Sequence, residues 1–312
     1  MEAIAETARL PARPQTSRFL KPEALTGYLL ISPAVFLMLV LLAYPFVLAV
    51  SISLTDRVLG EPGKFIWFRN FFKLLQDSLF RQTVWNSFVY TAATVFFKML
   101  LGILLALLLN QEIPCRNLIR GAILLPWIVP TSLSVLTWLW MFDSLFSVVN
   151  YILLGLGLIS KKIPWLGDPF WAMVSVIIVN TWRGLPFFAV SFLAGLMTIP
   201  RELYEAAETD GAKVLRQFWH ITLPLLQPVI AVVVLFSTIW TFADFQIVYI
   251  LTHGGPINAT QIFATMAYDV ALVAGRIGEG SAISLFLFPA LLIVIILMLR
   301  SPIPSEGIAA SG

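Results

Sequence analysis

The sequence predicts an all-α membrane protein that crosses the bilayer six times. Of its 312 residues, 59% are hydrophobic and only 12% are charged, which is too much apolar surface to bury inside one water-soluble globule. Crossing the roughly 30 Å hydrocarbon layer takes about 20 apolar residues in a helix, because unpaired backbone groups are costly in lipid. Six segments meet this requirement, near residues 27–50, 84–109, 121–141, 172–195, 228–251 and 281–299.

The first apolar segment is expected to be a retained anchor helix. The uncharged stretch Ala24–Thr55 is too long for a signal peptide and has no small-residue cleavage site. A basic tail, residues 1–23, precedes it, and an excess of Lys and Arg favours the cytoplasmic side. Six crossings then return the short tail 301–312 to the same side, with residues 24–300 as the transmembrane domain. The basic residues of the first tail are Arg9, Arg13, Arg18 and Lys21.

Two apolar stretches are placed outside the six spans. The loop Asp56–Thr83 mixes aromatic residues with Arg69 and Lys73, which favours either a helix lying at the membrane surface or an aromatic belt without a further role. The segment Ser144–Ser160 is uncharged, but it is short and is weakened by Asn150 and two glycines. We therefore reject it as a seventh span.

The connection at residues 196–224 changes from lipid-like to charged and helical, and we call it the elbow. Pro200 stands where a helix can begin, and Glu205 lies near the positive end of that helix. Gly211 permits a left-handed bend, after which a second short amphipathic helix is expected. Its apolar residues are Val214, Leu215, Phe218 and Trp219, and Pro224 and Pro228 are expected to mark the return into the membrane. Such a pair of helices suits either a knob for a partner's groove or a plain connector.

The elbow carries a spaced motif that resembles a known family. It reads Glu205-Ala206-Ala207, three residues, Gly211, nine residues, then Ile221-x-Leu223-Pro224. This pattern, in the loop before the fifth span, is similar to the EAA signature loop of permease subunits in binding-protein-dependent ABC importers. Other segments resemble the carbohydrate-uptake branch, in the subunit type of the maltose transporter's larger permease and the glycerol-3-phosphate transporter's first permease. They are Tyr44-Pro45, Leu107-Leu108-Leu109-Asn110, Leu125-Pro126-Trp127-Ile128-Val129-Pro130, Ile199-Pro200-Arg201-Glu202-Leu203-Tyr204 and Leu251-Thr252-x-Gly254-Gly255-Pro256.

The resemblance implies a type I importer permease fold in a bacterial cytoplasmic membrane, with the elbow as a coupling helix. It also implies three partners: a second, similar permease, a homodimeric cytoplasmic ABC ATPase and an extracytoplasmic solute-binding protein. ATP and Mg would bind to the ATPase, so this chain is expected to hold no cofactor and no catalytic residue. The residues expected to contact or couple to the ATPase are Glu205, Ala206, Ala207, Asp210, Gly211, Phe218, Ile221, Leu223 and Pro224.

Two polar patches within the spans are candidate solute contacts. In the fifth span, polar and aromatic residues recur at spacings of three and four, which places them on one helical face. A charge at that depth should face protein or water, so Asp244 either lines a solute pathway or pairs with Arg183 or Lys98 to neutralise charge. Mixed aromatic and polar groups suit sugar recognition. The candidates are Asn180, Trp182 and Arg183 in the fourth span and Ser237, Trp240, Thr241 and Asp244 in the fifth.

Other classes of function find little support in the sequence. There is no Gly-x-x-x-x-Gly-Lys-Ser/Thr nucleotide loop, and Cys115 is the only cysteine, so neither ATP hydrolysis nor a thiolate metal cluster is expected. The net charge of +3 is scattered, which disfavours nucleic acid as a partner. An intramembrane enzyme would need converging catalytic groups, and a channel would need a filter motif. The main alternative is an ion-gradient-driven carrier, and the solute stays open among saccharides, polyols and a phosphate ester such as glycerol phosphate.

Overall fold

The computed structural model describes residues 22–112 and 114–300, with side chains from 25–112 and 114–296. It divides into two compact units, Met1–Ser51 and Ile52–Gly312. The basic residues of the first tail and the tail 301–312 lie outside the described residues. Within these limits the chain is helical, and the only extended pairing in the described part is a single bridge between Thr55 and Phe65.

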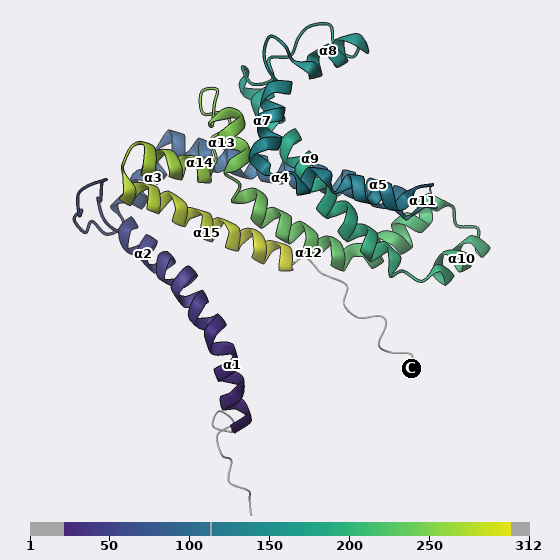
Figure 1. Ribbon diagram of the computed structural model, residues 1–312, viewed down its shortest axis with the longest axis horizontal. Helices are drawn as coiled ribbons and strands as arrows, with labels where there is room; N and C mark the ends of the chain where they lie inside the picture. The colour runs from purple at the N-terminus through teal and green to yellow at the C-terminus, as the bar shows by residue number, and fades with distance from the viewer. Residues whose placement is uncertain (1–21, 113, 301–312) are drawn as a thin grey trace, which may run out of the picture. The chain divides into compact units, whose positions relative to one another are not determined.

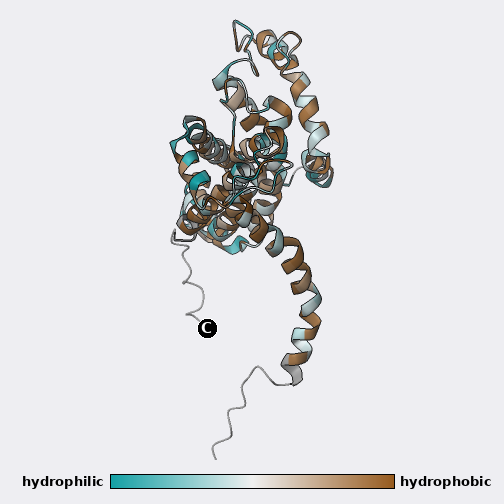
Figure 2. Ribbon diagram, turned by 90° about the vertical axis from the view of Figure 1, so that its left-hand side faces the viewer, coloured by the Kyte–Doolittle hydropathy of each residue, from teal (hydrophilic) through white to brown (hydrophobic). Residues whose placement is uncertain are grey.

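The described residues of the first unit belong to one long apolar helix, which ends at Ser53. It comprises α1 (Pro22–Met38), the π-helical turn η2 (Leu39–Ala43) and α2 (Tyr44–Ser53). Residues Leu25–Ser53 are long and apolar enough to cross a membrane, and hydrophobic residues predominate along them (Figure 2). The anchor helix expected from the uncharged stretch Ala24–Thr55 is therefore present as a helix.

Four long helices lie side by side in the second unit: α4 (Ser78–Asn110), α9 (Pro169–Met197), α12 (Leu223–Phe242) and α15 (Ile277–Arg300) (Figure 1). The side chains of Asp77 and Asp168 cap the first two by accepting hydrogen bonds from backbone amides of the first turn. Gly102 lets α4 approach α9 closely, because a Cβ there would lie 2.5 Å from the Cβ of Phe188.

The third predicted span is not one straight helix. Residues Arg116–Ile128, comprising α5 (Arg116–Ile123) and α6 (Leu125–Ile128), meet α7 (Thr131–Met141) at a bend of 90°. The continuous helix predicted over 121–141 is therefore wrong. The bend follows from Pro130, which has no backbone N–H and forces the preceding residue, Val129, into an extended conformation (ψ 133°).

The fifth predicted span, 228–251, is displaced along the chain. A continuous helix runs over Val214–Phe242, through α11 (Val214–Gln217), the π-helical turn η3 (Phe218–Thr222) and α12. It ends at Phe242, and α13 (Gln246–Thr252) starts afresh after a short break. Pro224 and Pro228, expected to mark the return into the membrane, lie inside the helix, because a proline is tolerated in a first turn and in membrane helices whose neighbours compensate.

Short helices occupy the two ends of the bundle. At one end lie α3 (Arg69–Gln76), α14 (Phe263–Tyr268) and the π-helical turn η4 (Asp269–Val273), and at the other lies α10 (Arg201–Thr209) (Figure 1). The segment Ser144–Ser160 contains only α8 (Val148–Gly155), which at 8 residues is too short to cross a bilayer. The loop helix expected within Asp56–Thr83 is α3, anchored by an ion pair of 2.8 Å between Lys73 and Glu279.

Candidate functional site: the elbow and a polar pocket

The elbow is a short exposed helix followed by a sharp left-handed turn. Helix α10 ends at Thr209, and Gly211 then adopts φ +77°. The amide of Gly211 donates to the carbonyl of Glu208 at 2.9 Å, and the amide of Ala212 donates to that of Ala207 at 2.8 Å. These two bonds are those of a Schellman motif, which closes a helix end with glycine in the left-handed position.

The turn leads directly into the long helix. Val214 is the first residue of α11, and the helix continues without interruption to Phe242. The second element of the elbow is thus the first turn of a long helix, which corrects the prediction of two separate short helices. Two side-chain bonds brace the junction: the hydroxyls of Tyr204 and Thr222 lie 2.9 Å apart, and the amide of Gln217 donates to the carbonyl of Ala212 at 3.1 Å.

The elbow presents apolar side chains that the described chain does not cover. Leu203, Leu215 and Trp219 are exposed, and Val214 is 81% exposed. Of the residues expected to couple to the ATPase, Glu205, Ala206, Asp210, Gly211 and Pro224 are exposed, whereas Ala207, Phe218, Ile221 and Leu223 are partly buried. The elbow therefore combines an exposed outer surface with a rim packed onto the bundle.

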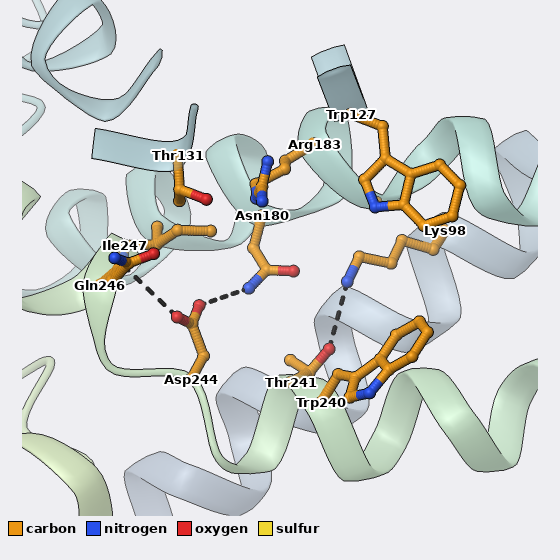
Figure 3. A pocket seen from close by; sticks show the side chains of 11 residues that line it. Lys98, Trp127, Thr131, Asn180, Arg183, Trp240, Thr241, Asp244, Gln246 and Ile247 are labelled. Atoms are coloured by element: carbon orange, nitrogen blue, oxygen red, sulfur yellow. Dashed lines mark hydrogen bonds between the residues drawn. The ribbon is translucent and has the colours of Figure 1, made fainter. Parts of the chain in front are cut away.

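A second feature is a cavity of about 340 Å³ between α4, α9 and the end of α12 (Figure 3). Five of the seven residues predicted to contact solute line it: Asn180, Arg183, Trp240, Thr241 and Asp244. The other two do not. Trp182 points to a different cavity, where its ring meets Trp138 edge to face at 5.6 Å, and Ser237 is buried in the packing of α12.

Asp244 reaches the pocket by a route that the helical spacing did not predict. Because α12 ends at Phe242, the carboxylate lies in the break before α13 rather than on a continuous helical face. Its Oδ2 accepts hydrogen bonds from the hydroxyl of Tyr90 and the amide of Asn180, each at 2.7 Å. Asp244 therefore joins α4, α9 and the α12–α13 break at one point.

The basic residues of the pocket do not pair with Asp244. The Nζ of Lys98 donates to the hydroxyl of Thr241 at 3.1 Å, and the Nη1 of Arg183 is buried without a hydrogen-bond partner. Among the described residues, ion pairs within 4.0 Å join Glu279 to Lys73 and Arg276, and none involves Asp244. The direct pairing considered from the sequence is thus not formed in this structure.

Several pocket residues were missed in the sequence. Trp127, Thr131, Gly184, Gln246 and Ile247 line the cavity, and the buried Tyr90 supports it through its hydrogen bond to Asp244. Tyr90 and Gly184 could have been noticed in the sequence, because a hydroxyl and a glycine are unusual within apolar spans. Only the packing of the helices shows that Tyr90 lies against Asp244 and Gly184 against Lys98. A Cβ at Gly184 would lie 2.8 Å from the Nζ of Lys98, so the glycine makes room for that ammonium. In the described part of the chain, no three His, Cys, Asp or Glu residues form a metal-binding group.

The comparisons with known proteins assign the family. Residues 98–301 match the sequence model of a family described as the inner membrane component of binding-protein-dependent transport systems. The chain belongs to this family. It is a multi-pass membrane protein and a permease subunit of an ABC importer, so the ion-gradient alternative is set aside.

Two similar proteins are permease subunits of transport systems. The chain is 36% identical over 283 residues to the sulfoquinovosyl glycerol transport system permease protein SmoG of Agrobacterium fabrum, covering 89% of this chain and 90% of that protein. It is 36% identical over 286 residues to the trehalose/maltose transport system permease protein MalF of Thermococcus litoralis, covering 91% and 96%.

The fold is also similar to that of a solved structure. One chain in the crystal structure of a bacterial ABC transporter involved in the import of the acidic polysaccharide alginate matches with a TM-score of 0.76 at 23% identity, covering 89% of this chain and 95% of that chain. The permease fold expected from the sequence is therefore confirmed.

Proposed function

We propose that this permease carries a saccharide or a related solute through the pocket around Asp244, driven by an ATPase that grips the elbow. The single observation that carries the proposal is the continuous helix Val214–Phe242, which begins at the elbow and ends beside the pocket. At 1.5 Å per residue, its 29 residues span about 43 Å. A displacement of the elbow can therefore reach the pocket along one continuous helix.

The chemistry of the pocket suits a sugar. The indoles of Trp127 and Trp240 can cover the apolar face of a sugar ring, while Asn180 and Thr241 can meet its hydroxyls. At about 30 Å³ per water, a cavity of about 340 Å³ has the capacity of roughly eleven waters, which leaves room for one sugar ring. The names of the two similar proteins, for trehalose/maltose and sulfoquinovosyl glycerol transport, support the same class of solute.

The proposed assembly has four kinds of subunit. A second, similar permease stands beside this chain, a homodimeric ATPase binds ATP and Mg in the cytoplasm, and a binding protein delivers the solute from outside. The elbow and both chain ends face the cytoplasm, and this chain itself holds no cofactor. ATP-driven closure of the ATPase shifts the elbow, and the helices move between two packed arrangements that open the pocket to one side or the other.

The solute pathway is tested by transport kinetics in proteoliposomes that contain the whole assembly. Asp244→Asn is expected to change KM or the order of preference among solutes, because the carboxylate lines the pocket and orients Asn180 there. Ser237→Ala is the matched control, since Ser237 is buried near Asp244 in the sequence but does not line the pocket. Equal effects of the two substitutions on KM would remove Asp244 from the pathway.

The energy source is tested in the same vesicles. Uptake is expected to require ATP and the binding protein, and Glu205→Arg, on the exposed face of α10, should lower uptake while ATP hydrolysis continues. Uptake driven by an ion gradient without ATP, or normal uptake by the Glu205→Arg variant at normal abundance, would contradict the proposal.

A further inference from the structure

The pocket contains two basic side chains and one acidic side chain, and the acidic one accepts its hydrogen bonds from neutral groups of the protein. Besides Tyr90 and Asn180 on Oδ2, the backbone amide of Ile247 donates to Oδ1 of Asp244 at 3.4 Å. Figure 3 shows the carboxylate turned toward Asn180 and Ile247. Asp244 therefore accepts hydrogen bonds from neutral donors of its own chain, and neither Lys98 nor Arg183 forms an ion pair with it.

Arg183 is the less satisfied of the two basic residues. A guanidinium is always protonated in proteins, and it has five donors and no acceptor. Its Nη1 is buried, and its side chain makes no hydrogen bond or ion pair with any described residue. Because a buried guanidinium nitrogen without an acceptor is unfavourable, the position favours an acceptor from outside this chain, and an anionic acceptor would also offset the positive charge.

Lys98 adds a second donor on the same cavity. The side chain is 4% exposed, and its ammonium uses one of three donors on Thr241, at 3.1 Å. Gly184, next to Arg183 in sequence, leaves the space in which this ammonium lies. The two donors thus belong to one site built from α4 and α9.

Aromatic walls accompany these donors. Trp127 and Trp240 are 47% and 55% exposed, and both line the cavity together with Lys98 and Arg183 (Figure 3). Exposed indole faces suit the apolar face of a sugar ring, whereas a free inorganic anion would make no use of them.

We propose that the solute joins a sugar ring to an oxyanion, such as a carboxylate, sulfonate or phosphate group. Arg183 and Lys98 receive the oxyanion, and Trp127 and Trp240 cover the ring. This inference rests on the proposed role of the pocket in transport. A neutral sugar would offer hydroxyl acceptors to Arg183, but it would leave the excess positive charge of the pocket uncompensated.

The test measures binding to the assembled transporter in lipid nanodiscs, without the binding protein, by titration calorimetry at fixed ionic strength. The probes are D-glucuronate, D-glucose and sulfate, which present a sugar with an anion, a sugar alone and an anion alone. D-glucuronate is expected to bind at least tenfold more tightly than either of the others, a difference of about 1.4 kcal/mol.

Two substitutions and one control locate the preference. Arg183→Gln should reduce the preference for D-glucuronate over D-glucose to near unity, whereas Arg183→Lys, which keeps the charge, should retain part of it. Lys161→Gln, at an exposed basic residue of another loop, should leave all three affinities unchanged. Retention of the full preference by Arg183→Gln would overturn the assignment.

Four other outcomes also overturn the inference. Equal binding of D-glucuronate and D-glucose, or no binding of any probe, means that the pocket does not select an anionic sugar. Sulfate binding as tight as that of D-glucuronate means an adventitious ion only. Loss of the second permease from the Arg183→Gln assembly, with unchanged probe affinities, assigns the arginine to a subunit interface. ATP-dependent uptake in proteoliposomes remains a separate readout, so a neutral solute would refute this inference without refuting the proposed transport.

Discussion

Gly211 offers a direct test of the elbow, because a substitution there affects the backbone conformation without a clash with neighbouring atoms. The residue adopts φ +77°, and its amide N–H closes α10 by donating a hydrogen bond to the carbonyl of Glu208. A Cβ at this position would meet no heavy atom within 4 Å. Any effect of Gly211→Ala therefore comes from conformational strain and not from a clash.

The expected size follows from the conformation. An L-residue in the left-handed region costs about 1–2 kcal/mol, which reduces the population of the closed turn by about 5–30-fold relative to alternatives. Asparagine tolerates this region better than alanine does, and proline cannot enter it because its ring fixes φ near −65°. Proline at position 211 would also remove the hydrogen bond to Glu208. Coupling should therefore decrease in the order Gly, Asn, Ala, Pro.

The assay is the number of solute molecules imported per ATP hydrolysed in proteoliposomes, with the amount of permease determined in each preparation. The number of solute molecules imported per ATP should be close to the wild-type value in Gly211→Asn and lower in Gly211→Ala. In Gly211→Pro it should be close to zero, because the assembly hydrolyses ATP with little uptake. A normal import-to-hydrolysis ratio in all three variants at equal abundance would refute the role of the turn. An equal decrease of this ratio in Gly211→Asn and Gly211→Pro would also refute it.

Three further predictions concern the packing of α4, the loop after α8 and the junction at the elbow. Gly102→Ala should lower the melting temperature of the complex, since overpacking against α9 costs about 1–3 kcal/mol, whereas Gly121→Ala, which faces open space, should not. Asn150→Ala should speed hydrogen exchange across 144–165, because the buried amide holds the backbone and an indole of the loop after α8, at about 1–3 kcal/mol; unchanged exchange would contradict this. Tyr204→Phe should weaken coupling through loss of a bond of about 0.5–1.5 kcal/mol, and Thr222→Val should add nothing to it if that bond is the cause.

The sequence predicted which segments form long helices better than it predicted where those helices end, as two prolines illustrate. The apolar segments predicted all the long helices, because their composition and length leave few alternatives in lipid. Their ends were harder to place. Pro130 breaks a predicted span at 90°, whereas Pro228 lies inside a helix that continues, and the difference depends on neighbouring packing that the local sequence does not contain.

The pocket was predictable in its ingredients but not in its geometry. Helical periodicity predicted that Asp244 and Thr241 share one helical face, but α12 ends between them. The carboxylate of Asp244 is instead positioned by Tyr90 and Asn180, which belong to two other helices. Such contacts join residues far apart in the chain, so periodicity within one segment cannot reveal them. Gly211 was the opposite case, since the need for a left-handed residue is local and can be recognised from the sequence.

Cysteine crosslinking at the elbow shows whether the ATPase contacts this segment. Cys115 is exposed, so it would first be replaced by serine, and single cysteines would then be introduced at Leu203, Val214 and, as a control at the opposite end of the bundle, Ile257. The two elbow cysteines are expected to form adducts with the ATPase, in yields that change with ATP, and the control cysteine is expected to form none. Labelling of the elbow cysteines by an impermeant reagent from outside the cell, without any ATPase adduct, would contradict this expectation.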